Sequence, residues 1–239
     1  MHQKAIFNYF LNGFFLANRS LDIFLISLLL YLPTFLSSYI QNSFFAKVLQ
    51  LSHFILLFIS IGFTLSLPVF LIQKQQNKAL DYGQVVKATL KNTKRLILPG
   101  ILLFILFTIV LMASFVLAAI SLHPSKDQVT SFFQSIGKGW HPIFLIPIVL
   151  IAFLEFTSFF FSLEGNGLLS SVKKSIVVAF NNLKYISIII LISLISTITS
   201  FIPIETFLGP LVKMILSGYI ALVLTASSLL YYQTVIYKS

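Results

Sequence analysis

Glu155 is the residue of this sequence best suited to chemistry, because it is an acid inside a long apolar run, LIPIVLIAFLEFTSFFFSL. If the run crosses a bilayer as a helix, Glu155 lies about eight residues, or about 12 Å, from the later end of the run. A charge at that depth costs about 2.5 kcal/mol or more unless it is paired, protonated or hydrated. Two interpretations follow: a proton or cation site inside a helix bundle, or a carboxyl group hydrogen-bonded to Ser or Thr of a neighbouring helix. The sequence places no Lys or Arg at similar depth, which disfavours a salt-bridge relay.

Other kinds of chemistry lack their residues. The chain has no Cys, and His53, His123 and His141 show neither an HxxxH spacing nor a neighbouring acid cluster, so they are better explained as interface anchors than as metal ligands. G-x-S-x-G, P-loop and HExxH motifs are missing, and Gly165-Asn166-Gly167 is typical of a turn. We therefore predict a protein that is not an enzyme and that uses no cofactor or metal.

Composition indicates that much of the chain lies in lipid. Hydrophobic residues make up 58% of it, charged residues 9%, and the mean hydropathy is +0.99, whereas a soluble domain keeps roughly a quarter of its residues charged. The net charge of +10 would suggest nucleic acid in a soluble protein. Here the cations stand between apolar runs, where anionic lipid headgroups are the nearer partner, so we predict lipid contact and no nucleic acid.

Six apolar stretches are long enough to cross a hydrocarbon core of about 30 Å as helices. They lie near 21–40, 51–72, 96–122, 141–163, 185–204 and 210–236. Each run is continuous rather than alternating and exceeds the length of a membrane β-strand. The stretch at 21–40 begins too late for a cleaved signal sequence, so we expect it to be retained. The prediction is an all-α, polytopic membrane protein.

Basic residues give the orientation of these spans. Twelve of the sixteen Lys and Arg residues fall on one side when the spans are threaded in order, six of them in 73–95. By the positive-inside rule this side is cytoplasmic. We predict a multi-pass protein of the cell membrane with both termini in the cytoplasm.

Three segments, 1–20, 73–95 and 164–184, show an amphipathic helical pattern and lead directly into a span. Their apolar stripes are Ile6, Phe10 and Phe14; Tyr82, Val86, Leu90 and Thr93; and Leu169, Val172, Ile176, Phe180 and Leu183. A basic amphipathic helix lies in the membrane interface, with its apolar stripe toward acyl chains and its lysines toward headgroups. We call these segments the arms. The predicted headgroup contacts are Arg19, Lys87, Lys91, Lys94, Arg95, Lys173, Lys174 and Lys184.

The junctions between arm and span indicate an internal repeat. ANRSLDIFLIS, KNTKRLILPGI and FNNLKYISIII each place an Asn, then a cation, then a span, with the Asn at 18, 92 and 181. Each unit is an interfacial helix, a span out and a span back, so the repeats are parallel and related by an axis along the membrane normal. The units cover roughly 1–72, 73–163 and 164–239 of a single membrane domain.

SLEGNGLLSSVKKSIVVAFNNLKYI at 162–186 and LLYYQTVIY at 229–237 complete this pattern of basic helices and hairpins. With them the chain resembles the bacterial six-helix families around the membrane domain of glycerophosphodiester phosphodiesterase. In those families a Glu-Gly step, a Lys/Arg-Ser pair and a bulky residue opening the next span recur, and Glu164-Gly165, Lys174-Ser175 and Tyr185 match here. The resemblance implies a six-helix membrane domain without the soluble phosphodiesterase domain, and it transfers no catalytic residue.

Two functions remain open from the sequence. One is a non-enzymatic membrane protein that organises or binds anionic lipid, or a membrane protein partner or second copy, at the cytoplasmic face. The alternative is a small transporter or lipid permease with Glu155 as an intramembrane polar site, which predicts a polar cavity reaching Glu155.

Overall fold

A computed structural model describes residues 2–37, 43–121, 145–200 and 209–237, and these residues form helices joined by short turns. In chain order the helices are α1 (His2–Asn18), α2 (Leu21–Ser37), α3 (Ser43–Gln75), α4 (Tyr82–Ser121), α6 (Leu145–Phe153), α7 (Thr157–Ser162), α8 (Leu168–Asn181), α9 (Leu183–Ser200), α10 (Gly209–Tyr231) and the short π-helix η2 (Tyr232–Ile236). The predicted all-α class is confirmed for this part of the chain.

Several of these helices are long and apolar enough to cross a bilayer. Within the described ranges they are Leu56–Gln75, Leu145–Ser162 and Gly209–Ile236, and two bent helix pairs raise the number from three to five if each pair is one span. Six spans and their repeat therefore stay predictions. The outer loop predicted at 123–140, with His123, and parts of the predicted spans fall outside the described residues.

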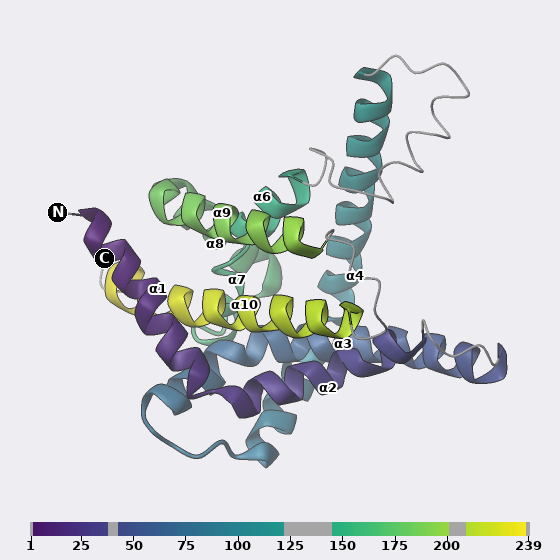
Figure 1. Cartoon of the computed structure of the whole chain (residues 1–239), viewed down its shortest axis with the longest axis horizontal. Helices are drawn as coiled ribbons and strands as arrows, with labels where there is room; N and C mark the ends of the chain where they lie inside the picture. Colours follow the sequence, from purple (N-terminus) through teal and green to yellow (C-terminus); the bar gives the residue numbers. More distant parts are fainter. Residues whose placement is uncertain (1, 38–42, 122–144, 201–208, 238–239) are drawn as a thin grey trace.

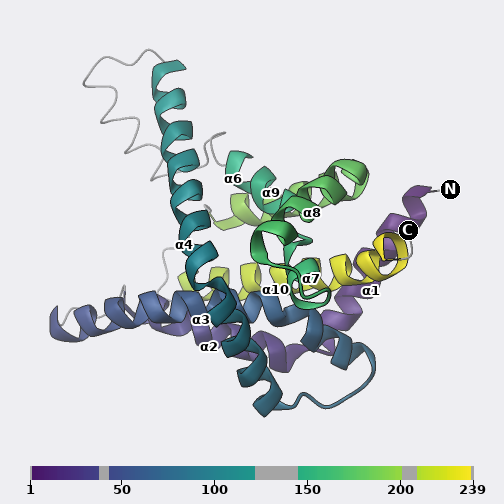
Figure 2. The ribbon, with the colours of Figure 1, turned by 180° about the vertical axis from the view of Figure 1, so that it is seen from behind.

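Figure 1 shows α2, α3 and α10 running side by side, with α9 beyond α10. The α4 helix crosses α3 and then extends away from the other helices, as the opposite view also shows (Figure 2). The α1 helix packs along the C-terminal half of α10, and α7 lies between α3 and α8. The described helices thus pack into one bundle, from which the later part of α4 extends.

The three junctions, similar in sequence, differ in geometry. The α1–α2 pair bends by 76° and the α8–α9 pair by 102°. At these bends Ser20 Oγ donates to Leu16 O (2.8 Å), and Asn182 Nδ2 donates to Val178 O (2.8 Å). Such side chains compete with the backbone for helical hydrogen bonds. In α4 the side chain of Asn92 instead donates to Ser66 Oγ of α3 (2.8 Å), and the helix continues through the predicted junction.

The turn between α3 and α4 uses residues suited to helix ends. Asn77 has φ of 55°, a left-handed conformation that Asn tolerates, and Lys78 N–H donates to Gln73 O (2.9 Å) to close the end of α3. The carboxylate of Asp81 accepts from the N–H of Gly83 (2.9 Å) and caps α4. The basic stretch 73–95 is therefore a helix end, a tight turn and a new helix.

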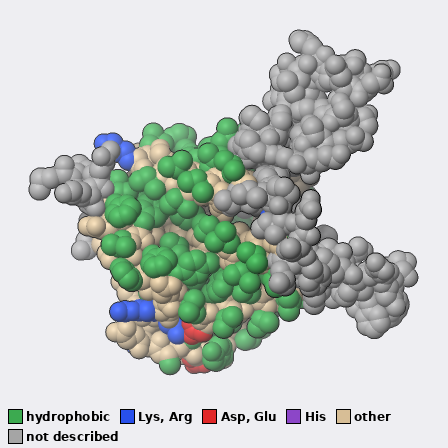
Figure 3. All heavy atoms as spheres, in the orientation of Figure 1, with side chains coloured by type: hydrophobic (Ala, Val, Ile, Leu, Met, Phe, Trp, Pro, Cys, Tyr) green, Lys and Arg blue, Asp and Glu red, His purple; other side chains and the backbone are tan. Residues whose placement is uncertain are grey.

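Charged side chains gather at one end of the bundle. The bends of α1–α2 and α8–α9, the α3–α4 turn and the end of α10 all lie on the left in Figure 1, where the N and C marks are adjacent. Figure 3 shows hydrophobic side chains over most of the described face and the charged ones mainly at this same side. An ion pair between Lys74 and Asp22 (2.5 Å) ties the end of α3 to the start of α2 there. We call this the charged end.

Two arms cross their partner helices at glycines. A Cβ atom on Gly13 of α1 would lie 2.7 Å from the backbone nitrogen of Ser227 in α10. A Cβ atom on Gly62 of α3 would lie 3.0 Å from the carbonyl oxygen of Thr89 in α4. Small residues allow helices in membranes to approach closely, so these two glycines set the depth at which α1 and α4 pack.

Candidate functional site

Each arm has three faces rather than the two that the sequence pattern predicts. In α8 the side chains of Ser171, Ser175 and Ala179 are fully buried against the protein. The predicted apolar stripe is only partly on the outside: Leu169 is 58% exposed and Phe180 61%, whereas Val172 and Ile176 are half-buried. Lys173 and Lys174 are exposed on the same outer side. The helix therefore attaches through small residues and presents apolar and basic stripes side by side.

The first turns of α4 follow the same plan. Thr89 and Asn92 belong to the stripe buried against α3, whereas Val86 is 58% exposed and Leu90 is also exposed. In α1 the buried stripe contains Gly13 and Ala17, with Phe7, Leu11, Phe14 and Phe15 exposed beside Asn8 and Asn12. In water such surfaces would be unfavourable, and exposed apolar patches of this size mark contact with membrane or protein.

The predicted headgroup contacts are mostly accessible. Arg19, Lys87, Lys91, Lys94, Lys173, Lys174 and Lys184 are exposed. Lys174 also pairs with Glu164 (2.7 Å) and lies 5.5 Å from the centre of the Phe160 ring. Headgroup contact stays a prediction for all of these cations.

Arg95 has a different environment from its neighbours in sequence. Its Nη2 donates to the carbonyl oxygens of Asn166 (2.8 Å) and Gly165 (3.2 Å), and Nη1 reaches that of Phe161 at 3.5 Å. The guanidinium carbon also lies 4.0 Å from the centre of the Phe161 ring. Arg95 thus closes the C-terminal end of α7 and joins it to α4, which is a positioning role within the protein.

Glu164 lies in the loop that Arg95 contacts, and it accepts hydrogen bonds from three side chains. Its carboxylate accepts from Lys174 Nζ (2.7 Å), from Asn166 Nδ2 (2.8 Å) and from the Tyr232 hydroxyl (2.6 Å). The next residue, Gly165, has φ of +72°, which favours glycine. Partial burial raises the pKa of the Glu164 carboxyl, but the hydrogen bonds outweigh it and hold the pKa below its ordinary value.

Acidification should therefore weaken this end of the fold. Because the pKa of Glu164 is lower in the folded than in the unfolded chain, its contribution to stability is complete above the ordinary Glu value of about 4.3 and is lost as pH falls through the folded value. We expect the melting temperature of the parent in detergent to fall more steeply below about pH 4 than that of Glu164→Gln. If the melting temperatures of the two proteins fell equally steeply with pH, the lowered pKa of Glu164 would be contradicted.

Glu155 lies at a break between α6 and α7 that the sequence did not predict. Ser175 of α8 closes the break: its hydroxyl donates to Phe153 O (2.8 Å) and accepts from the N–H of Phe156 (3.1 Å). One side chain thereby satisfies a donor and an acceptor that the interrupted helix leaves without partners. The break turns the Glu155 carboxyl group toward α9 and α10, where Tyr185 and Ser228 lie close to it.

Tyr185, beside this carboxyl group, belongs to a cluster of tyrosines. The hydroxyl of Tyr185 lies 3.1 Å from Ser228 Oγ, and both side chains are fully buried. The ring of Tyr231 stacks on that of Tyr185 with centroids 4.0 Å apart, and its hydroxyl donates to Asn182 Oδ1 (2.7 Å). The Tyr9 ring contacts Tyr231 edge to face at 5.3 Å. Helices α1, α9 and α10 thus meet in an aromatic layer beside Glu155.

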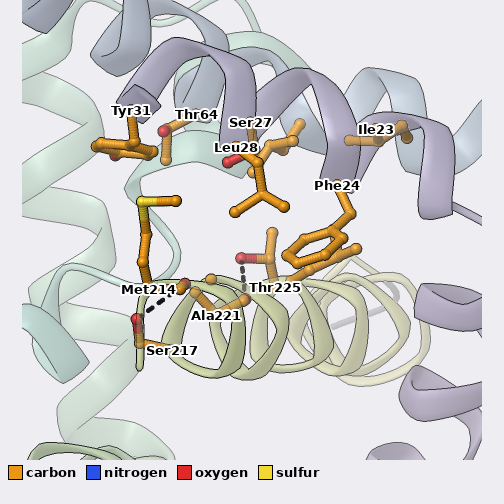
Figure 4. A pocket seen from close by; sticks show the side chains of 13 residues that line it. Ile23, Phe24, Ser27, Leu28, Tyr31, Thr64, Met214, Ser217, Ala221 and Thr225 are labelled. Carbon is orange, nitrogen blue, oxygen red and sulfur yellow. Dashed lines mark hydrogen bonds between the residues drawn. The ribbon is translucent and has the colours of Figure 1, made fainter. Parts of the chain in front are cut away.

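A separate cavity of about 500 Å³ lies between α2, α3 and α10 (Figure 4). Its lining includes no charged side chain and does not include Glu155. The hydroxyls of Thr64, Ser217 and Thr225 donate to carbonyl oxygens of their own helices. Because most of the lining is apolar, the cavity offers mainly carbon surface and suits an aliphatic chain better than a polar solute.

Some of the residues quoted for the family resemblance lie in two clusters, and the resemblance itself stays a prediction. Glu164, Tyr232 and Lys174 form one cluster, and Tyr185, Tyr231 and Ser175 surround the break at Glu155. Sequence reasoning singled out Glu155 but missed Ser228, Asn182 and Tyr9, which show no distinguishing pattern among many Ser, Asn and Tyr residues.

Among the described residues, no group of three or more His, Asp or Glu side chains is placed to hold a metal ion. Comparison of the chain with protein-family models, with curated proteins and with solved structures finds no match.

Proposed function

We propose that this chain is a non-enzymatic integral membrane protein that binds and organises anionic lipid at its cytoplasmic face. The observation that carries the proposal is the exposed apolar stripe beside a basic one on the arms α4 and α8. An interfacial helix buries its apolar side about 5–10 Å into the headgroup and acyl boundary and directs lysines to the headgroups.

Charge supports anionic rather than neutral lipid. Each Lys or Arg near an anionic membrane surface contributes about 1 kcal/mol of attraction. The exposed Lys87, Lys91 and Lys94 share one arm, and Lys173 and Lys174 share another. The proposal includes six spans in three hairpins, a place in the cell membrane and cytoplasmic termini. This arrangement is supported because it places the arms and the turns together at the charged end.

The lipid preference can be tested with two matched triple variants. Replacing Lys87, Lys91 and Lys94 by Gln should reduce the retention of phosphatidylglycerol over phosphatidylcholine by about tenfold or more, given about 1 kcal/mol per cation. The variant with Arg at the same three positions keeps the charge and should retain the preference. The measurement is native mass spectrometry of protein released from nanodiscs that contain both lipids. Equal retention of the two lipids by the parent would overturn the proposal.

A transporter remains the second candidate, because the Oε1 atom of Glu155 is buried without a hydrogen-bond partner. A carrier of polar solutes would need a polar route to this atom. The cavity between α2, α3 and α10 does not supply it, since Glu155 is not among its lining residues. Lipid binding therefore accounts for more of the described surface. A membrane protein partner or a second copy would use the same apolar stripes.

A further inference from the structure

The Glu155 carboxyl group has no counter-charge among the described residues. Their ion pairs join Lys74 to Asp22 and Lys174 to Glu164. The groups that face Glu155 are the hydroxyls of Ser228 from α10 and Tyr185 from α9, and next to them those of Tyr231 and of Tyr9 from α1. The side chain of α8 at the break is Ser175, which also carries no charge.

This environment favours a neutral carboxylic acid. An ionised carboxylate only accepts hydrogen bonds, and here its Oε1 would be buried with nothing to accept from. A protonated group can donate to the Ser228 oxygen instead, and it avoids the free-energy cost of placing a charge deep in a membrane helix.

Hydroxyl groups extend from Glu155 toward the charged end. Ser228 Oγ lies 3.1 Å from the Tyr185 hydroxyl, and the Tyr185 ring stacks on that of Tyr231, which the Tyr9 ring contacts edge to face. The Tyr9 hydroxyl accepts from Thr234 Oγ1 (2.9 Å), and Thr234 is exposed. Each of these hydroxyl groups can accept one proton and donate another.

We propose that Glu155 is a reversible proton-binding site whose nearest proton carriers are Ser228 and Tyr185. In the loaded state the proton is on the carboxyl group. On release the proton leaves by way of Ser228 and Tyr185 to water, and Glu155 becomes a carboxylate. The site is independent of lipid binding, because none of these residues lies on the exposed stripes of α4 and α8.

Infrared difference spectroscopy of the whole chain in nanodiscs tests the site. We expect the parent to show the carbonyl stretch of a protonated carboxylic acid at neutral pH, to shift this band in D₂O, and to lose it at alkaline pH. Glu155→Gln should lack the band. Glu164→Gln should keep it, because Glu164 is an ion-paired carboxylate.

Two results would overturn the proposal: no protonated-acid band in the parent, or a band that neither exchanges in D₂O nor titrates. If Glu155→Gln does not fold, Glu155→Asp provides the assignment, because a shorter side chain must displace the band. The route is tested by Tyr185→Phe, which should keep the band and slow its exchange at least tenfold. Unchanged exchange in that variant would exclude Tyr185 as a carrier.

Discussion

Gly13→Val is expected to detach α1 from α10 and to lower the melting temperature of the detergent-solubilised protein more than any single change on the exposed stripes. The added Cβ would meet backbone atoms of Ser227, at 2.7 Å from nitrogen and 2.8 Å from Cα. Backbone cannot rotate away as a side chain can, so the helices must separate. Overpacking typically costs about 1–3 kcal/mol, and we expect the upper end of that range or more.

Gly218→Ala is the control, because it also places a Cβ atom on a helical glycine. Its Cβ would lie 3.4 Å from a ring carbon of Phe24, which leaves the melting temperature near that of the parent. A cysteine at Ala17 reports on detachment, since Ala17 is fully buried and the chain has no other Cys. The thiol should react with maleimide only in the Gly13→Val background. Equal melting of the valine variant and the parent would refute the close crossing of α1 and α10.

Arg95→Ala should have the next largest effect, a loss of about 2–4 kcal/mol in the free energy of unfolding. The change removes hydrogen bonds from a charged donor, each worth about 1.5–3 kcal/mol, and leaves partly buried carbonyl oxygens at the end of α7 without partners. It also removes the cation from the face of the Phe161 ring. The measurement is thermal unfolding in detergent, together with protease cleavage at the loop 163–167.

Two neighbouring substitutions distinguish this role from contact with lipid. Lys94→Ala, at an exposed position, should change stability by no more than about 0.5 kcal/mol. Arg95→Lys keeps the charge but cannot direct a planar group to several carbonyl oxygens and an aromatic ring at once, so it should not restore stability. Full rescue by lysine would show that the positive charge alone matters at this position.

The comparison of Lys94 with Arg95 shows where sequence reasoning reaches its limit. Both cations lie in the same arm, and helical periodicity alone predicts headgroup contact for both. Only the fold brings the loop at 165–166, some seventy residues later, under the guanidinium group of Arg95. The apolar and basic stripes of the arms were predictable because they repeat with the helical period. The third face was not, because Gly, Ala and Ser carry little hydropathy signal.

The break at Glu155 was unpredictable for a similar reason. The segment IAFLEFTSFF has no Pro or Gly, the usual local signals of an interrupted helix. The side chain that closes the interruption is Ser175. Its hydroxyl accepts a hydrogen bond from the N–H of Phe156, nineteen positions earlier in the sequence. The α1–α2, α4 and α8–α9 junctions make the same point, because similar sequences give two bends and one continuous helix. The side chain of Asn92 finds a partner in α3 at the junction that stays straight.

The packing of α1 on α10 has a consequence for biogenesis. The hydroxyls of Tyr9 and Thr234 meet although 225 positions separate them, so α1 cannot reach its final place until nearly all of the intervening chain has left the ribosome. At about 5–20 residues per second this interval is roughly 10–45 s, long compared with the formation of a helix. During that wait the phenylalanines of α1 can rest on the bilayer surface, which keeps a nascent hydrophobic segment from aggregating before its partner is inserted.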